Sequence, residues 1–149
     1  MENGVNFSFK IICPQCPDIP SWDISKLEKF ISEVRLPNQK LIISGYSMGG
    51  TATWDLAHIN NININGIISV SGNYCHSDIN QLSNISIPAI YGENDSRFIN
   101  SNILKVTNVI NQHHGHATLI ILKNKGHEIG QDAFILSDLN KWILSLSYC

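Results

Sequence analysis

The sequence predicts an α/β fold of three layers, in which a mostly parallel sheet of about five strands is flanked by helices. Short apolar runs alternate along the chain with longer amphipathic segments. The apolar runs are almost uniformly hydrophobic, which is typical of parallel strands that are buried on both faces. Clusters of Gly, Pro and Asn separate the segments and indicate turns. At 149 residues, the chain is most simply one domain over residues 1–149.

The first half of the chain is expected to hold two strands, two helices and a loop. Phe7–Cys13 is apolar and rich in β-forming residues, which predicts a strand, and the prolines that follow predict a loop over Pro14–Trp22. A helix is expected over Asp23–Val34, because its apolar residues recur three and four positions apart, and Asp23 or Ser21 is suited to cap it. The next expected elements are a strand over Lys40–Tyr46 and a helix from Met48 to about His58.

The second half repeats this alternation. Its apolar runs predict strands, and a polar connection with one helical turn is expected over Gly72–Ser86. Its longer segments carry apolar residues at helical spacing, as at Ile103, Val106 and Ile110. The expected elements are strands over Gly66–Ser71 and Ile87–Gly92, a helix from Arg97 to about His113, a strand over Ala117–Lys123 and a helix over Asp132–Leu146.

The segment Gly45-Tyr46-Ser47-Met48-Gly49 has the form Gly-x-Ser-x-Gly and joins an expected strand to an expected helix. In so tight a turn, side chains on either side of the serine would collide. We expect Gly45 and Gly49 to avoid that collision, so that the backbone can hold Ser47 in a strained, exposed conformation. A strand, this turn and a helix form the nucleophile elbow of the α/β-hydrolases, which predicts that Ser47 is a nucleophile.

A serine nucleophile needs a base, and the base needs an acid that orients it. In α/β-hydrolases the three residues follow in the order Ser, Asp or Glu, His. Asp95 and His127 each come just after an expected strand, in that order. Because the carboxyl ends of parallel strands meet at one edge of a sheet, we expect Ser47, Asp95 and His127 to lie together. Glu93, two positions before Asp95, is the alternative acid.

The other histidines have simpler interpretations. His113, His114 and His116 resemble a metal cluster, but they follow an expected helix and precede a strand. His58 also lies near the end of a helix. A histidine at such an end interacts favourably with the helix dipole. We therefore expect these residues to stabilise the carboxyl ends of the helices and to bind no metal.

Two pairs that contain cysteine are weaker candidates for chemistry. Cys75 and His76 are adjacent and could form a Cys–His dyad, although nothing else in that segment indicates an activated nucleophile. Cys13 and Cys16 have the spacing of a redox motif or of half a zinc site, but no second such pair is present. The sequence therefore predicts neither a metal nor a cofactor.

These segments together resemble the phospholipase/carboxylesterase and dienelactone-hydrolase-like esterases of the α/β-hydrolase superfamily. The resemblance spans nearly the whole chain and implies that Ser47 is the nucleophile, Asp95 the acid and His127 the base. The segments that carry it are Pro14-Gln15-Cys16-Pro17 before Trp22, Gly45–Ala57, Val70-Ser71-Gly72, Tyr91–Asp95 and Gly126-His127-Glu128.

The chain departs from this family in its first residues. Relatives usually begin with additional strands and a helix, and one of those strands ends in a His-Gly-rich loop that supplies the second oxyanion donor. The first donor is retained as the backbone N–H of Met48. We expect Phe7–Cys13 to move inward and pair with Lys40–Tyr46, which would bring the N–H of Gln15 or Cys16 to the oxyanion as a replacement.

The helix with which relatives begin normally covers one face of the sheet. One face is left to the final helix, whose apolar residues are Phe134, Leu136, Leu139, Trp142 and Ile143. Apolar sheet surface that stays exposed usually indicates a partner, so that we expect a homodimer.

Composition excludes several other classes of partner. The net charge of −2 and the pI near 6.3 give no reason to expect nucleic acid or an anionic membrane surface. No run of about 18 apolar residues is present, so that no membrane span is expected. The first residues lack the pattern of a signal peptide, which predicts a cytoplasmic protein.

The sequence thus predicts a serine hydrolase that cleaves a small carboxylic ester or thioester through an acyl-enzyme on Ser47. The alternative is a catalytically weak binding or regulatory domain that keeps the hydrolase fold without a full oxyanion hole. A peptidase of the same fold is the third and least favoured candidate.

Overall fold

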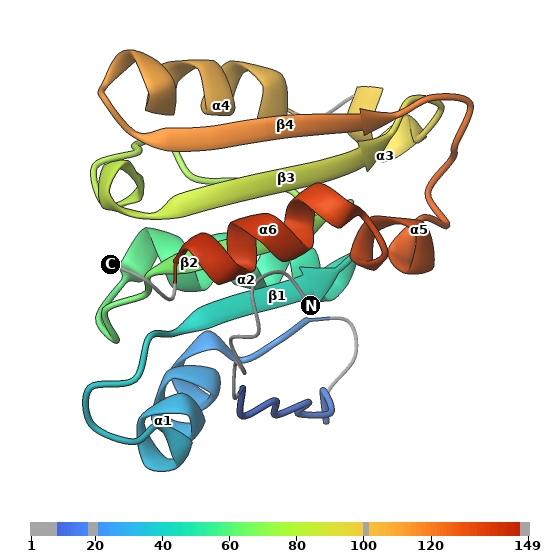
Figure 1. Cartoon of the computed structure of the whole chain (residues 1–149). Coiled ribbons are helices and arrows are strands. Elements are labelled where there is room, and N and C mark those ends of the chain that lie inside the picture. Colours follow the sequence, from blue (N-terminus) through green and yellow to red (C-terminus); the bar gives the residue numbers. More distant parts are fainter. Residues whose placement is uncertain (1–8, 18–20, 100–101, 147–149) are drawn as a thin grey trace.

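A computed structural model of the protein describes residues 9–17, 21–99 and 102–146. Its centre is a parallel sheet with the strand order β1-β2-β3-β4 (Figure 1). The strands are β1 (Ile42–Tyr46), β2 (Gly66–Val70), β3 (Ser86–Gly92) and β4 (His116–Leu122). The α/β class and the parallel sheet are confirmed, and the described sheet has four strands where about five were expected.

Helices cover both faces of the sheet, which gives the three expected layers (Figure 1). One face carries α1 (Ile24–Val34), α2 (Met48–Ile59) and α4 (Ile103–Gln112), and the other carries α5 (Gly130–Phe134) and α6 (Ser137–Ser145). Two short helices, η1 (Leu82–Asn84) and α3 (Ser96–Ile99), lie in the connections before β3 and after it. None of the helices in the described ranges is long and apolar enough to cross a membrane.

The pleat of the strands divides the apolar side chains between two cores. In β2 all five residues are buried, Ile67 packs with the helices of the first face, and Ile68 and Val70 pack on the opposite face. This alternation follows from the two-residue period of a strand. Burial on both sides explains why the strand segments read as continuous apolar runs.

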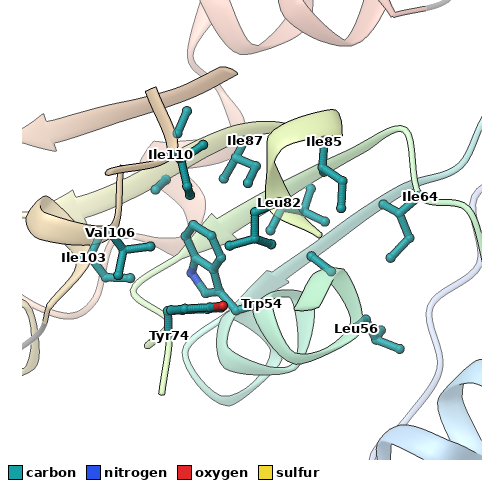
Figure 2. Packing of buried hydrophobic residues seen from close by; sticks show 14 of the residues in the cluster. Trp54, Leu56, Ile64, Tyr74, Leu82, Ile85, Ile87, Ile103, Val106 and Ile110 are labelled. Atoms are coloured by element: carbon teal, nitrogen blue, oxygen red, sulfur yellow. The ribbon is translucent and has the colours of Figure 1, made fainter. Parts of the chain in front are cut away.

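The larger core fixes the position of α2. Trp54 of α2 is fully buried, and its ring lies 5.4 Å from that of Tyr74 in an edge-on arrangement. Leu82 and Ile110 are also fully buried in this cluster (Figure 2). Because α2 is anchored through these contacts, the turn that precedes it is held at the carboxyl edge of the sheet.

Most of the expected elements are confirmed within one or two residues. The helix expected over Asp23–Val34 is α1, and Asp23 rather than Ser21 caps it, because the Asp23 Oδ1 accepts from the Lys26 N–H at 3.0 Å.

The strand expected over Phe7–Cys13 is wrong in the part that the structure describes. Residues 9–13 form no strand, and Phe7 lies outside the described residues. β1 is an edge strand that pairs with β2, so that the described residues 9–13 do not pair with it. Phe9 and Ile11 are 50% and 82% exposed. β-propensity describes how well a residue fits a half-buried pleated surface, and it does not by itself determine that a segment joins a sheet.

Two long helices were expected where the structure has pairs of shorter ones. The segment Arg97–His113 is divided into α3 and α4, and the segment Asp132–Leu146 into α5 and α6. Leu136 is extended, with φ −62° and ψ 123°, and separates the second pair. The break lets Ala133 of α5 and Leu139 of α6 enter the same core, whereas Phe134 stays 43% exposed.

Candidate active site

Ser47 occupies the turn between β1 and α2. Its φ of 55° and ψ of −113° are unusual for a residue with a side chain, and such strain persists only when the surroundings impose it. The Ser47 N–H donates to the Val70 carbonyl at 2.8 Å, and the Ser47 carbonyl accepts from the Thr51 N–H at 3.0 Å. The turn is therefore fixed on one side by β2 and on the other by the first turn of α2.

Glycines allow the backbone segments around this turn to approach closely. The two crowded positions are Gly45 and Gly50, whereas Gly45 and Gly49 were expected. A Cβ on Gly45 would lie 2.2 Å from the carbonyl carbon and oxygen of Gly49, which no folded chain tolerates. The expected need for a glycine at Gly49 is wrong, because a Cβ there would meet nothing within 4 Å. The crowded helical position is Gly50, where a Cβ would lie 2.6 Å from the Val70 carbonyl oxygen. The start of α2 thus approaches β2 too closely for a side chain at Gly50.

The structure brings Ser47, His127 and Asp95 together in a line of hydrogen bonds. Ser47 Oγ lies 2.9 Å from His127 Nε2, and His127 Nδ1 lies 2.8 Å from Asp95 Oδ2. An ionised carboxylate can only accept, so that the proton belongs on Nδ1 and Nε2 is left to accept from the serine hydroxyl. The arrangement can remove a proton from Ser47 Oγ.

Asp95 is the buried end of this line, with 1% of its surface exposed. Its second oxygen, Oδ1, accepts from the Arg97 N–H at 2.9 Å. Burial raises the pKa of Asp95, but hydrogen bonds from the His127 side chain and the Arg97 N–H and the charge of His127 together lower it by more. The pKa therefore lies below its ordinary value of 3.8, and the carboxylate is ionised at neutral pH.

This lowered pKa predicts a pH-dependent contribution of Asp95 to stability. The folded state favours the ionised carboxylate, so that Asp95 stabilises the fold above the unfolded pKa of about 4 and loses this effect as the pH falls through the lower folded pKa. We expect Asp95→Asn to lower the free energy of unfolding at pH 7, with a difference from the wild type that shrinks below about pH 4. Urea denaturation between pH 7 and pH 3 measures this, and a difference that stays constant down to pH 3 would contradict it.

Neither Glu93, the alternative acid, nor the possible Cys75–His76 dyad takes part in this line of hydrogen bonds. Glu93 is exposed, and its Oε2 accepts from the Asn124 N–H at 2.9 Å. His76 Nε2 contacts Asp55 Oδ1 at 2.8 Å, and the exposed thiol of Cys75 has no hydrogen-bond partner among the described residues. The His76 ring also stacks on that of His58 at 3.8 Å. His76 is thus paired with a carboxylate and not with the thiol.

Tyr46 and Ser71 support His127, and neither was predicted from the sequence as a site residue. The Tyr46 hydroxyl donates to the His127 carbonyl at 3.2 Å, and Ser71 Oγ reaches the same oxygen at 3.5 Å. Burial, and after it the hydrogen bond and charge of Glu128, raise the pKa of Tyr46, so that the phenol keeps the proton it donates. The place of Tyr46 directly before Ser47 is the signal that could have identified it.

Arg97 is a third residue that was not predicted from the sequence. Its Nη1 lies 3.1 Å from Ser47 Oγ and 3.1 Å from His127 Nε2. A guanidinium is always charged and can only donate, so that both contacts place a positive donor at the serine oxygen and the histidine nitrogen. Its position two residues after Asp95, at the start of α3, is the signal that was available.

A pocket of about 240 Å³ opens beside Ser47. Met48 lines it as the first residue of α2, where a backbone N–H has no partner within the helix. Gln15 and Cys16 are not among the lining residues, and the Cys16 thiol faces the Ser21 carbonyl at 3.6 Å. In the described part of the chain, no three His, Cys, Asp or Glu side chains are grouped so as to hold a metal ion. The lining residues are Ser21, Trp22, Ser47, Met48, Thr51, Ala52, Asp55, Ser71, Asn73 and Arg97.

Residues 23–135 match the sequence pattern of the dienelactone hydrolase family. This stretch contains the elbow, Asp95 and His127, and it makes up most of the chain. No curated protein gives a significant match.

Solved structures share the fold at low sequence identity. Zea mays acyl-protein thioesterase 2 is 14% identical, with a TM-score of 0.64 over 83% of this chain and 62% of its own. Arabidopsis thaliana SOBER1 is 16% identical, with a TM-score of 0.62 over 82% and 60%. A bacterial esterase is 16% identical, with a TM-score of 0.62 over 82% and 41%. The chain thus spans about three-fifths of the length of the first two structures and less than half of the length of the third. Sequence identities this low show a likeness of fold alone.

Proposed function

Because this chain belongs to the dienelactone hydrolase family, we propose that it is a serine hydrolase that cleaves a small carboxylic ester or thioester. The observation that carries the proposal is the unbroken line of hydrogen bonds from Ser47 Oγ through His127 to Asp95. In this proposal Ser47 is the nucleophile, His127 the base and Asp95 the acid that orients it. The esterases and the thioesterase that share the fold support the same class of reaction.

Acylation begins at the strained turn. Ser47 Oγ attacks the acyl carbon while His127 Nε2 takes its proton over the 2.9 Å contact. The carbonyl oxygen becomes negative, and the N–H of Met48 at the start of α2 donates to it. The C–O or C–S bond to the leaving group then breaks, the proton passes from His127 to that group, and the acyl group stays on Ser47.

Deacylation uses the same residues. Water attacks the acyl carbon, His127 takes its proton, and the ester bond to Ser47 breaks as the proton returns to Oγ. Asp95 stays ionised throughout and stabilises the imidazolium that forms in each half-reaction, for which its lowered pKa is suited. The pocket of about 240 Å³ favours a small acyl or alcohol group.

A fluorophosphonate probe, combined with hydrolysis of p-nitrophenyl acetate, tests this function. We expect the wild type to be labelled and to hydrolyse the ester. We expect Ser47→Ala not to be labelled and to have a kcat lower by a factor of about 10⁶. Ser44→Ala, at an exposed residue of β1 three positions earlier, is the matched control and should behave as the wild type. An unlabelled, inactive wild type would contradict the proposal and favour the alternative of a binding or regulatory domain.

A further inference from the structure

Arg97 places a positive charge directly at the proposed nucleophile and base. The residue lies in α3, and its backbone N–H is fixed by the Asp95 carboxylate at 2.9 Å. Its side chain lines the pocket and reaches Ser47 Oγ and His127 Nε2, both at 3.1 Å. The same carboxylate therefore orients His127 through one oxygen and the Arg97 backbone through the other.

This charge has no counterion in the described ranges. None of the described carboxylates forms an ion pair with Arg97. The Asp95 side chain faces His127, and Asp55, the other acid that lines the pocket, is held by His76 at 2.8 Å. Within the described residues, the hydrogen bonds of the guanidinium go only to the Ser47 hydroxyl and the His127 imidazole, so that it is available to a negative charge that forms in the pocket.

Such a charge forms on the carbonyl oxygen during acyl transfer, and its stabilisation generally takes two donors. The N–H of Met48 is one. Gln15 and Cys16 were expected to supply the other, but neither lines the pocket, and the described residues 9–13 do not pair with β1. We propose that Arg97 supplies the second oxyanion donor, an inference that rests on the function proposed above.

The chemistry of the attack explains how Arg97 would change partners. As the Oγ–C bond forms, the hydroxyl proton moves to His127 Nε2, which can then no longer accept from Arg97. At the same moment the carbonyl oxygen takes up the electron pair of its π bond and becomes negative. This oxygen and Oγ share one carbon, so that the new acceptor lies within a small movement of the guanidinium. The interaction is stronger in the transition state than in the free enzyme, which is the condition for it to accelerate the reaction.

Two other roles for Arg97 predict different results. Nη1 occupies space beside Oγ and Nε2 that a leaving group must enter, so that a residue that only covers the site would raise activity when removed. A residue that only binds an anionic substrate would change KM for anionic esters and leave neutral esters unaffected. The neutral ester p-nitrophenyl acetate therefore separates all three roles.

The experiment compares Arg97→Met and Arg97→Lys with the wild type. We expect Arg97→Met to lower kcat for p-nitrophenyl acetate about 100-fold with little change in KM, and Arg97→Lys, which keeps a charge with fewer donors, to lose less. Lys105→Met removes an exposed charge from α4 and should leave kcat unchanged. Arg97→Gln serves as the uncharged variant if the methionine variant does not fold, which circular dichroism would reveal.

Phenylboronic acid gives a second readout without turnover. It forms a tetrahedral, negatively charged adduct with a serine nucleophile, so that its Kd should rise in Arg97→Met by about the factor lost from kcat. An unchanged or raised kcat in Arg97→Met, or an unchanged Kd for the boronate, would overturn the role of Arg97 while an active wild type upholds the hydrolase. A wild type that neither hydrolyses the ester nor reacts with the fluorophosphonate would overturn the function and this inference together.

Discussion

We expect His127→Gln to lower kcat for p-nitrophenyl acetate by about 10⁶, the factor typical of removing the base from a triad of this kind. Nε2 is the acceptor placed at 2.9 Å from Ser47 Oγ, and glutamine offers no nitrogen that can take up a proton at neutral pH. Stopped-flow measurement of the acylation step isolates this effect, because it does not depend on how fast the acyl group leaves.

His116→Gln is the matched control for this variant. His116 is an exposed histidine at the start of β4, whereas His127 follows the opposite, carboxyl end of that strand. We expect the control to keep wild-type activity and both variants to keep the wild-type circular dichroism spectrum. A folded His127→Gln protein that retained more than a tenth of the wild-type kcat would contradict the role of His127 as the base.

The second large effect is on the fold, at Gly45. We expect Gly45→Ala to destabilise the protein by on the order of 3 kcal/mol, at the upper end of the range for overpacking. The new Cβ would meet the backbone of Gly49 at 2.2 Å, and backbone atoms at the start of a helix cannot move aside as a flexible side chain can. Urea denaturation measures the loss, and catalytic activity should fall with it, because the clash lies in the turn that holds Ser47.

Gly49→Ala makes the same change four residues later, and it separates the clash from a general effect of removing glycine. A Cβ at Gly49 meets nothing within 4 Å, and alanine favours a helix by up to about 1 kcal/mol over glycine. We therefore expect Gly49→Ala to leave stability unchanged or slightly higher. Equal losses in the two variants would show that the spacing around the turn does not determine its stability.

The environment of Asp95 links stability to the proposed chemistry. Its carboxylate holds the Nδ1 proton of His127 and the N–H of Arg97 with different oxygens, so that one buried charge positions both groups that contact Ser47 Oγ. Removing that charge should therefore disturb the base and the proposed oxyanion donor at once. The pH dependence expected for Asp95→Asn tests whether the charge is also part of what stabilises the fold.

The elements and the central site could be predicted from the sequence because their signals are local. Apolar runs buried on both faces indicated the parallel strands, and helical spacing indicated α1 and α2. Once the strands are parallel, residues that follow them share one edge of the sheet. This simple topology is enough to place Ser47, Asp95 and His127 near one another, without any knowledge of loop conformation.

Other features depend on which segments meet in space, and composition alone does not contain that information. Phe9 and Ile11 have strand-like neighbours but stay exposed, since β-propensity alone does not decide which segment pairs with the edge of a sheet. Gly49 and Gly50 look equivalent in sequence, and the approach of Val70 and Gly72 makes only the second one crowded.

Arg97 shows the same limit at the site. The position of Arg97 two residues after Asp95 places its backbone near the site, but it does not tell whether the long, flexible side chain points into solvent or towards Ser47. The folded chain decides this, because the Asp95 carboxylate fixes the Arg97 backbone and the pocket beside Ser47 leaves space for the guanidinium. Local pattern therefore predicted that Ser47, Asp95 and His127 lie together, whereas the charge that contacts Ser47 depends on tertiary contacts between distant segments.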